Sequence, residues 1–202
     1  MSKKILFTGF EPFGGETINP SLEAVMSLPD QIDDIVIKKM GLPVAFGKSA
    51  DVLRDMLNKD GFDAVICVGQ AGGKASINIE RIAINIDDCK SSDNEGAAPI
   101  DKPICPDGPA AYFATLPIKE IVANLVEANI PAVVSNTAGT YVCNHVMYEA
   151  LRYAAQNRPK MIVGFVHIPY LPVQVLDKSN VPSMSLEVVV EALVVIAKTT
   201  LR

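Results

Sequence analysis

The feature that most limits the fold of this chain is the regular alternation of short apolar runs with segments of helical periodicity. Six runs have the length and composition of strands: residues 4–9, 34–40, 63–69, 80–86, 132–136 and 161–167. Five segments have apolar residues at helical spacing: 20–28, 47–60, 117–129, 143–157 and 183–200. Strands that alternate with helices are typical of a mostly parallel sheet covered on both faces. We therefore expect an α/β fold, a three-layer α/β/α sandwich around a twisted open sheet.

The composition limits the domain organisation and the partners. With 202 residues, 49% of them hydrophobic, the chain can bury one sizeable core, so we expect a single domain over residues 1–202. The net charge is −5 and the 18 Lys and Arg residues are scattered, which gives no electrostatic reason to expect nucleic acid or a membrane as partner. The four cysteines lack paired spacing, as expected for free thiols in the cytoplasm.

Glycine-rich or aromatic loops follow four of the predicted strands. Their sequences are GFEPFGG (9–15), GQAGGK (69–74), NTAGT (136–140) and HIPYLPVQ (167–174). In an open α/β sheet, ligands bind outside the carboxyl ends of the strands. We therefore expect the four loops to meet at one edge of the sheet and to form a site there. The long segment 87–117 is a further candidate for a functional loop.

Cys143 stands where a loop of small residues becomes a helix, which makes it a candidate nucleophile. The unpaired N–H groups at a helix start favour a thiolate. Backbone amides near Thr137, Gly139 and Thr140 are expected to approach a substrate carbonyl. The alternative is a cysteine that only packs in the core, because an apolar stripe continues along this helix. The stripe consists of Val146, Met147, Ala150, Leu151 and Ala154.

A thiol nucleophile needs a base, and the sequence contains two histidines. His145 follows Cys143 by two residues, about 200° around the same helix, so the two side chains should diverge. His167 ends an apolar strand and should lie at the same sheet edge as the start of the Cys143 helix. We therefore predict His167 as the base, with a histidine that bonds a loop carbonyl as the alternative. A zinc site built from these three residues is disfavoured because no C-x-x-C or H-E-x-x-H motif accompanies them, so no metal is expected.

The base needs a carboxylate that orients its ring. Glu80 has the same strand parity as the isoleucines of the run 80–86, so it should point to the apolar side and have a buried partner. We predict that this partner is His167; the alternative is a structural pair with an arginine or lysine. Rival acids stand in the following loop: Asp87, Asp88 and Asp93.

The first loop places Phe10 and Phe13 three residues apart. It is not a phosphate loop, because it lacks the Walker lysine and the G-x-G-x-x-G spacing and contains Glu11. Two aromatic rings near the thiol would form a flat slot for a small neutral ring. The alternative is that the phenylalanines only pack beneath the first helix. Together with Gln70 and Val142, they form the substrate-binding set that we predict.

These motifs together resemble the pyroglutamyl peptidase I, or pyrrolidone-carboxylate peptidase, family of cysteine peptidases. The resemblance runs in order through TGFEPFGG, NPS (19–21), GQAGGK, ERIAINIDD, SDNEG, SNTAGTYVCNHVMY and GFVHIPYLP. It implies that Glu80, Cys143 and His167 are catalytic, and that Phe10 and Phe13 hold a pyroglutamyl ring.

The resemblance further implies hydrolysis of N-terminal pyroglutamate from peptides without a cofactor, and a homo-oligomer, in many members a tetramer. Two positions depart from the family pattern. Lys90 stands where the family often has Arg, and Val173 where it often has an acid before the glutamine of LPVQ. Because Arg and Lys differ in donor geometry, any stabilising role at position 90 is put in doubt. The competing function is a ligand-binding or phosphorylase-like α/β module in which Cys143 is structural.

Overall fold

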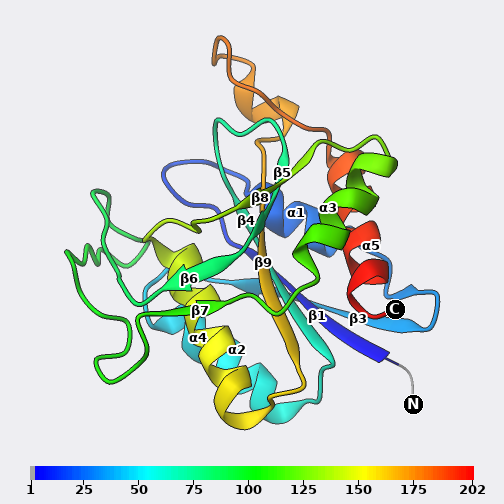
Figure 1. Ribbon diagram of the computed structural model, residues 1–202. Helices are drawn as coiled ribbons and strands as arrows, with labels where there is room; N and C mark the ends of the chain where they lie inside the picture. The colour runs from blue at the N-terminus through cyan, green and yellow to red at the C-terminus, as the bar shows by residue number, and fades with distance from the viewer. Residues whose placement is uncertain (1–2) are drawn as a thin grey trace.

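The computed structural model describes residues 3–202. Its strands are β1 (Lys3–Phe10), β2 (Gln31–Ile32), β3 (Ile35–Leu42), β4 (Ala64–Gln70), β5 (Ile77–Glu80), β6 (Ile82–Ile84), β7 (Ala111–Phe113), β8 (Ala132–Ser135) and β9 (Ile162–Ile168). Its helices are α1 (Pro20–Met26), α2 (Lys48–Lys59), α3 (Ile118–Glu127), α4 (Val142–Asn157) and α5 (Leu186–Thr200), with a 3₁₀ turn η1 (Pro172–Val175). Figure 1 shows how these elements are arranged.

A seven-stranded sheet forms the centre, in the order β2-β3-β1-β4-β9-β5-β8. The four strands β3, β1, β4 and β9 are parallel. β5 and β8 are parallel to each other, but β5 pairs antiparallel with β9. A separate two-stranded sheet, β6–β7, lies beside α4.

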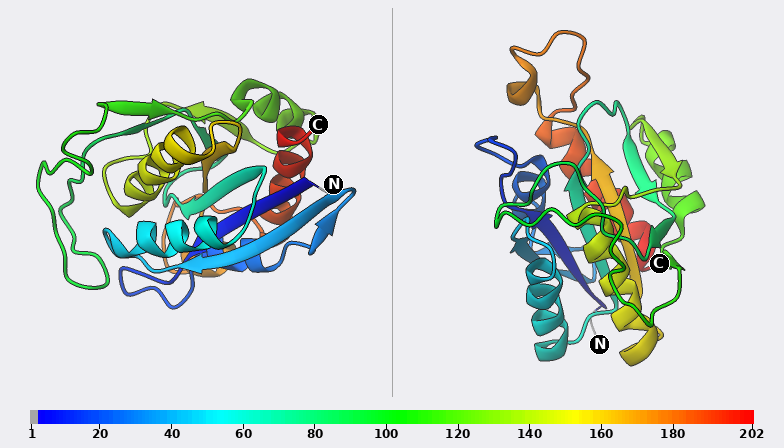
Figure 2. Two further views of the ribbon diagram at one scale, coloured as in Figure 1. Left: turned by 90° about the horizontal axis from the view of Figure 1, so that it is seen from below. Right: turned by 90° about the vertical axis from the view of Figure 1, so that its left-hand side faces the viewer.

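Helices cover both faces of the central sheet (Figures 1 and 2). One core packs α1, α3 and α5 against one face, and the other packs α2 and α4 against the opposite face. Side chains alternate along each strand, so neighbours such as Val166 and Phe165 enter different cores. The predicted three-layer α/β fold is confirmed, and each predicted helix is present with ends shifted by at most three residues.

The prediction of one strand over residues 80–86 is wrong. β5 ends at Glu80, and β6 begins at Ile82 in the other sheet. The side-chain parity reverses across this break: Ala83 is fully buried, whereas Ile86 is exposed. Glu80 is nevertheless buried, because it ends a strand of four buried residues.

The expectation that four loops leave one edge of the sheet is also wrong for residues 136–140. Because β8 runs opposite to β9, its carboxyl end points away from the carboxyl ends of β1, β4 and β9. The chain must turn back over this loop before α4 begins at Val142. The three other loops do follow strands that share one direction.

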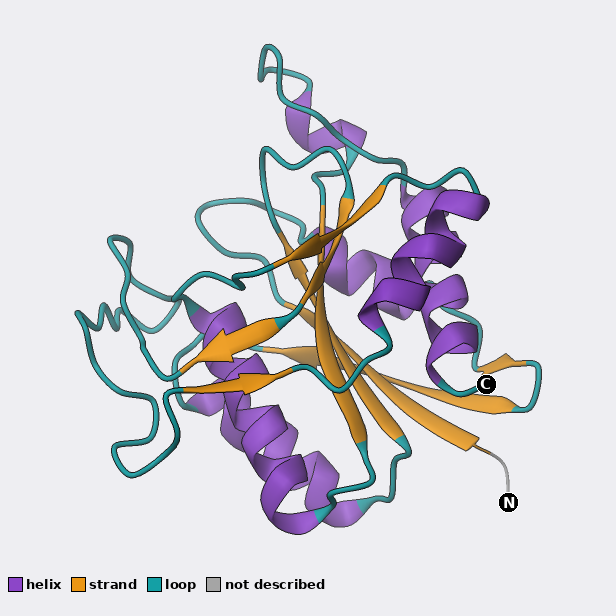
Figure 3. Ribbon diagram, viewed as in Figure 1, coloured by secondary structure: helices purple, strands orange, loops and turns teal. Residues whose placement is uncertain are grey.

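Two irregular segments stand out in Figure 3. The connection between β6 and β7 is long and has little regular structure, and the segment around η1 projects from the body of the protein. Within residues 3–202, none of the helices has the length and apolar character needed to cross a membrane.

Candidate active site

Cys143 is the second residue of α4, and its side chain is partly exposed. The preceding Tyr141 makes no side-chain capping bond to the helix. Gly69, near the end of β4, leaves room for the sulfur: a Cβ at this position would lie 3.0 Å from Cys143 Sγ and 2.8 Å from the Phe165 ring. The thiol therefore rests against the end of β4.

His167 stands on β9 directly beside Gly69 in the parallel ladder, so it lies next to the sulfur. Burial disfavours the charged imidazolium, but the charge and hydrogen bond of Cys143, followed by those of Glu80, outweigh it and raise the pKa of His167 to about 9. The predicted pairing of Cys143 with His167 is thus present in the structure.

Glu80 holds the other side of the imidazole. Its Oε1 accepts a hydrogen bond from His167 Nδ1 at 2.8 Å, and the carboxylate is buried. This contact arises because Glu80 lies opposite Phe165 in the antiparallel ladder, two residues from His167 and on the same face. Because Nδ1 of His167 donates its proton to Glu80 in this hydrogen bond, Nε2 is the ring nitrogen left to face the sulfur. The buried partner of Glu80 is therefore a histidine, not an arginine or lysine.

The rival acids are engaged elsewhere. Asp87 contacts His145, and Asp93 accepts hydrogen bonds from the backbone amides of Phe46, Glu95 and Ala97. Burial alone would raise the pKa of Asp93, but these amides lower it. Asp88 accepts a hydrogen bond from the backbone of Asp101 at 3.3 Å. None of the three acids is hydrogen-bonded to His167.

A small cavity of about 20 Å³ opens beside the thiol. Its walls are Phe10, Phe13, Asn19, Val44, Gln70, Tyr141, Val142 and Cys143. All four residues of the predicted substrate-binding set are among them. The volume corresponds to roughly one water molecule. We call this cavity the ring slot.

Aromatic contacts form two of the walls of the ring slot. Phe10 is buried and packs against Phe165, with ring centroids 6.3 Å apart. Phe13 packs at the same centroid distance against Tyr141. The alternative that the phenylalanines only support α1 is therefore not what the structure shows. Tyr141 was missed in the sequence; its signal was an aromatic residue two positions before Cys143.

Two further residues of the slot are held by polar contacts. Asn19 donates to the carbonyl of Glu11 at 3.0 Å, which ties the first loop to the start of α1. Gln70 accepts a hydrogen bond at 3.0 Å from the buried Gln174 of η1. The role of Gln174 could not be predicted from the sequence, because it depends on how the projecting segment folds back on β4.

Two of the backbone amides expected to approach a substrate carbonyl are engaged within their own loop. The amides of Thr137 and Gly139 are bonded within the loop, to Ser135 Oγ and Thr137 Oγ1. Thr140 is bonded to Asp88 through both its hydroxyl and its carbonyl. These contacts stabilise the turn that brings the chain from β8 back to α4.

The two departures from the family pattern lie near the mouth of the site. Lys90 lines a wider cavity of about 410 Å³ that shares Phe13 and Tyr141 with the ring slot. Val173 is 60% exposed on η1, next to the buried Gln174. Neither position contributes to the Glu80–His167–Cys143 arrangement.

The three residues of the disfavoured zinc site do not converge. His145 points to Asp87 and to the backbone of Gly47, whereas Cys143 faces His167. Among residues 3–202, no group of three or more His, Cys, Asp or Glu side chains is arranged to hold a metal ion.

Comparison with known proteins gives consistent results. The model of the pyroglutamyl peptidase family matches residues 3–202. The chain is 55% identical over 199 residues to the pyrrolidone-carboxylate peptidase of Thermosipho africanus, covering 98% of this chain and 97% of that protein. It is 55% identical over 192 residues to that of Alkaliphilus oremlandii, covering 95% and 90% of the two chains.

Solved structures agree with these relatives. The crystal structure of pyroglutamyl peptidase I from Bacillus amyloliquefaciens superposes with a TM-score of 0.96 at 47% identity, covering 99% of this chain and 95% of that one. A mutant pyrrolidone carboxyl peptidase from Pyrococcus furiosus superposes with a TM-score of 0.95 at 45% identity, covering 98% of each chain.

Proposed function

This chain belongs to the pyroglutamyl peptidase family, and on that premise we propose the roles of its residues. It is a cysteine peptidase that removes the N-terminal pyroglutamyl residue from peptides. Cys143 is the nucleophile, His167 the acid and base, and Glu80 the group that orients His167. The observation that carries this assignment is that Cys143 Sγ and His167 both lie at Gly69 of β4, while Glu80 accepts a hydrogen bond from the far side of the His167 ring.

In the first half of the reaction the bond to the leaving peptide is broken. Because the pKa of His167 is raised to about 9, its ring is protonated at neutral pH and lies as a cation beside the Cys143 sulfur. Cys143 reacts as the thiolate. The thiolate attacks the pyroglutamyl carbonyl carbon, and the carbonyl electrons move onto oxygen. Collapse of this intermediate breaks the C–N bond, and His167 gives its proton to the departing amine. A thioester between Cys143 and the pyroglutamyl group remains.

In the second half the thioester is hydrolysed. His167, now neutral, takes a proton from water as the water oxygen attacks the thioester carbonyl. Cys143 leaves as the thiolate and pyroglutamic acid is released. Throughout, Glu80 keeps the imidazole in one tautomer and stabilises its charged form.

The negative oxygen of each intermediate is held at the start of α4. The first amides of a helix have no partner within it, and they carry the positive end of its dipole. We assign this role to the amides of Cys143 and Asn144. They take the place of the Thr137 and Gly139 amides, which are bonded within their own loop.

The ring slot is assigned to the pyroglutamyl ring. Its walls are aromatic or polar and uncharged, which suits a lactam that carries no ammonium group. The slot is too small for the ring in this structure, so binding requires the Phe13 and Tyr141 walls to separate. Phe13 sits on a loop that contains two glycines at positive φ, Gly14 and Gly15, and this loop can make such a movement.

Self-association and a cytoplasmic location complete the proposal, with one domain over residues 1–202. α5 has partly buried valines at 190, 194 and 195 beside its core face. Val173 and Leu176, on the projecting segment, are 60% and 83% exposed. Such apolar surface supports a homo-oligomer, by resemblance a tetramer. A monomer mass in sedimentation at micromolar concentration would contradict this part.

The enzymatic proposal is tested with three coumarin amides. The pyroglutamyl amide should be hydrolysed. The prolyl and glutamyl amides should not be, because the prolyl amide lacks the lactam carbonyl and the glutamyl amide has a free ammonium group. Equal turnover of all three would contradict the assignment of the ring slot. The non-peptidase alternative is not favoured by the family relation, and absence of turnover on the pyroglutamyl amide would be needed to restore it.

A further inference from the structure

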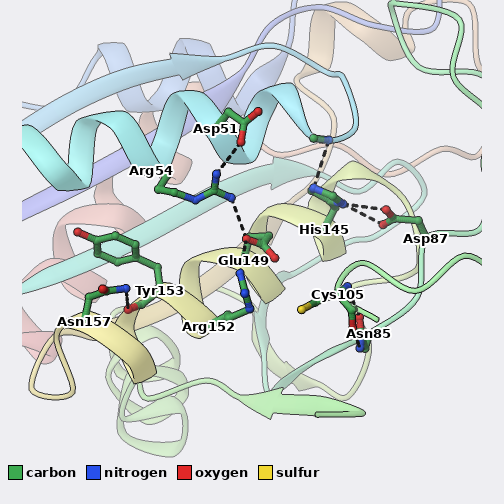
Figure 4. A network of polar contacts seen from close by, with 11 residues as sticks. Asp51, Arg54, Asn85, Asp87, Cys105, His145, Glu149, Arg152, Tyr153 and Asn157 are labelled. Carbon is green, nitrogen blue, oxygen red and sulfur yellow. Dashed lines mark hydrogen bonds and ion pairs between the residues drawn. The ribbon is translucent and has the colours of Figure 1, made fainter. Parts of the chain in front are cut away.

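His145 has no part in the proposed chemistry, yet it is buried and bonded on both ring nitrogens (Figure 4). Its Nδ1 lies 2.8 Å from one oxygen of Asp87 and 3.1 Å from the other. The backbone N–H of Gly47 donates to its Nε2 at 3.2 Å. This histidine therefore connects α4 with two separate segments of the chain.

These partners select one form of the ring. The backbone N–H of Gly47 can only donate, so Nε2 must carry a lone pair. The carboxylate of Asp87 only accepts, so Nδ1 must carry the proton. Asp87 thus holds His145 as the neutral Nδ1–H tautomer, and that tautomer is the one able to bind Gly47.

The Gly47 contact bears on one wall of the ring slot. Gly47 has φ of 70° and closes the turn formed by residues 44–47, which precedes α2 without a side-chain cap. Val44, at the start of this turn, lines the slot. Phe46 packs edge-on against both His145 and Tyr141, with centroids 5.8 and 5.3 Å away.

The Asp87 contact connects His145 to the other walls of the ring slot. Asp87 begins the segment 87–94, whose Asp88 is bonded to Thr140 just before α4. At its far end, Asn94 donates from its backbone to the carbonyl of Val44 and from its side chain to the carbonyl of Pro12, each at 2.9 Å. Pro12 precedes Phe13, so this segment ties the Phe13 loop, the 44–47 turn and the start of α4 together.

We propose that His145, held in one tautomer by Asp87, is a positioning residue that fixes the walls of the ring slot against α4. It sets the affinity for the pyroglutamyl ring and does not take part in the bond-breaking steps. This role rests on the proposed function of the slot. The placement of the proton on Nδ1 does not, because it follows from the contacts of His145 alone.

Four variants separate hydrogen bonding from packing. His145→Phe keeps an aromatic ring against Phe46 but loses both hydrogen bonds. His145→Gln keeps a donor and an acceptor side by side in one amide. Asp87→Leu removes the acceptor of the Nδ1 proton, so the ring is no longer held in the tautomer that accepts from the Gly47 N–H. His145→Ala removes both the aromatic ring and the two hydrogen bonds, and it carries the greatest risk of misfolding.

Glu149→Gln is the matched control. Glu149 lies one turn further along α4 and lines the same cavity as His145, of about 320 Å³. It forms ion pairs with Arg54 at 3.0 Å and Arg152 at 3.4 Å (Figure 4). These contacts do not reach the ring slot, so this variant should keep the KM of the unmodified protein.

The experiment measures kcat and KM for a pyroglutamyl coumarin amide, together with protection of Cys143 from iodoacetamide by 2-pyrrolidone, the bare lactam ring. Loss of the positioning hydrogen bonds should raise KM about tenfold in His145→Phe and Asp87→Leu, with kcat changed by less than about threefold. The 2-pyrrolidone concentration for half-protection should rise by a similar factor. His145→Gln should recover most of the loss.

Imidazole ¹⁵N spectra of the unmodified protein supply a readout that needs no turnover, and they should place the proton on Nδ1 of His145. The proposal would be overturned by a proton on Nε2 or by an unchanged KM in His145→Phe. It would also be overturned if the folded variants lost kcat and the rate of unprotected Cys143 alkylation to the same extent. Absence of pyroglutamyl hydrolysis in the unmodified protein would instead overturn the proposed function, and the tautomer could still be read from the spectra.

Discussion

Nδ1 of His167 lies 2.8 Å from Oε1 of Glu80, across the one antiparallel pairing between β9 and β5. The reversal of β5 places the carboxylate alongside β9 rather than beyond its end. Both groups are buried, so water screens the electrostatic attraction between them only weakly. The consequences can be measured through the pH dependence of His167.

Glu80→Gln should shift the alkaline limit of kcat/KM to lower pH. In the unmodified protein the imidazolium is lost as the pH rises through about 9, so activity should fall there. Glu80 contributes to the raised pKa of His167, after Cys143, so its neutral replacement should bring the limit closer to the ordinary value of 6.5. An unchanged pH profile would mean that Glu80 does not influence the pKa of His167.

The raised pKa of His167 also predicts how the stability of the fold depends on pH. Because the pKa of folded His167 is above its ordinary value, the contribution of the charged ring to folding is fully present below pH 6.5. It is lost as the pH rises through about 9. The urea midpoint of the unmodified protein should fall over this range, and the fall should be smaller in Glu80→Gln.

His167→Ala should lower kcat by about 10³-fold while the protein remains folded, because one residue serves as acid and base. Alkylation of Cys143 should slow as well, since the thiolate loses its cationic partner. Cys105→Ser is a suitable control, because Cys105 lines the cavity of His145 rather than the ring slot. Near-normal turnover in His167→Ala would assign the proton transfers to another group.

Phe13→Ala should raise KM, because the lost aromatic contact is made in both the ground state and the transition state. Loss of one packed ring costs about 1 to 3 kcal/mol, or roughly tenfold to a few hundredfold in kcat/KM. The rate of alkylation by iodoacetamide should stay nearly constant, because this reagent does not need the slot. Unimpaired hydrolysis would mean that Phe13 does not contact the substrate ring. An alkylation rate that falls as far as hydrolysis would indicate damage to the whole site.

Gly69→Ala should lower kcat on the order of a hundredfold by displacing the nucleophile. The new methyl group would lie 3.0 Å from Cys143 Sγ, and the stiff backbone of β4 cannot move away. Gly61→Ala is the matched control, because its nearest neighbour is a flexible arginine end at 3.8 Å. Equal activity of the two variants would mean that the sulfur does not rest against β4.

The helices and parallel strands could be predicted because periodic burial leaves a direct mark on the sequence. The direction of β5 could not, since an isolated strand has the same pattern in either direction. The break at Arg81 also shifts the apolar register, which made ERIAINI resemble one strand. Glu80 was assigned correctly as a buried acid, but its placement beside His167 depends on the reversed strand.

The site was predictable where a residue's chemistry stands at an element boundary, as with Cys143 at the start of α4 and His167 at the end of β9. It was not predictable where contacts join distant segments. Tyr141 and Val44 line the ring slot because of the turns around them, and Gln174 reaches Gln70 across 104 positions of the chain. His145 was considered only as a base or a zinc ligand, and its two bonding partners come from elsewhere in the sequence.

The measurement that tests the central claim most directly is residual hydrolysis of a pyroglutamyl amide as a function of the fraction of Cys143 carboxymethylated, with each cysteine mapped by mass spectrometry. Burial raises the pKa of Cys67 to about 12, and burial followed by nearby aspartates raises that of Cys89, so both should react slowly. We predict that activity falls in direct proportion to modified Cys143. Full activity with Cys143 completely modified, or a loss that follows Cys67, Cys89 or Cys105 instead, would contradict the account.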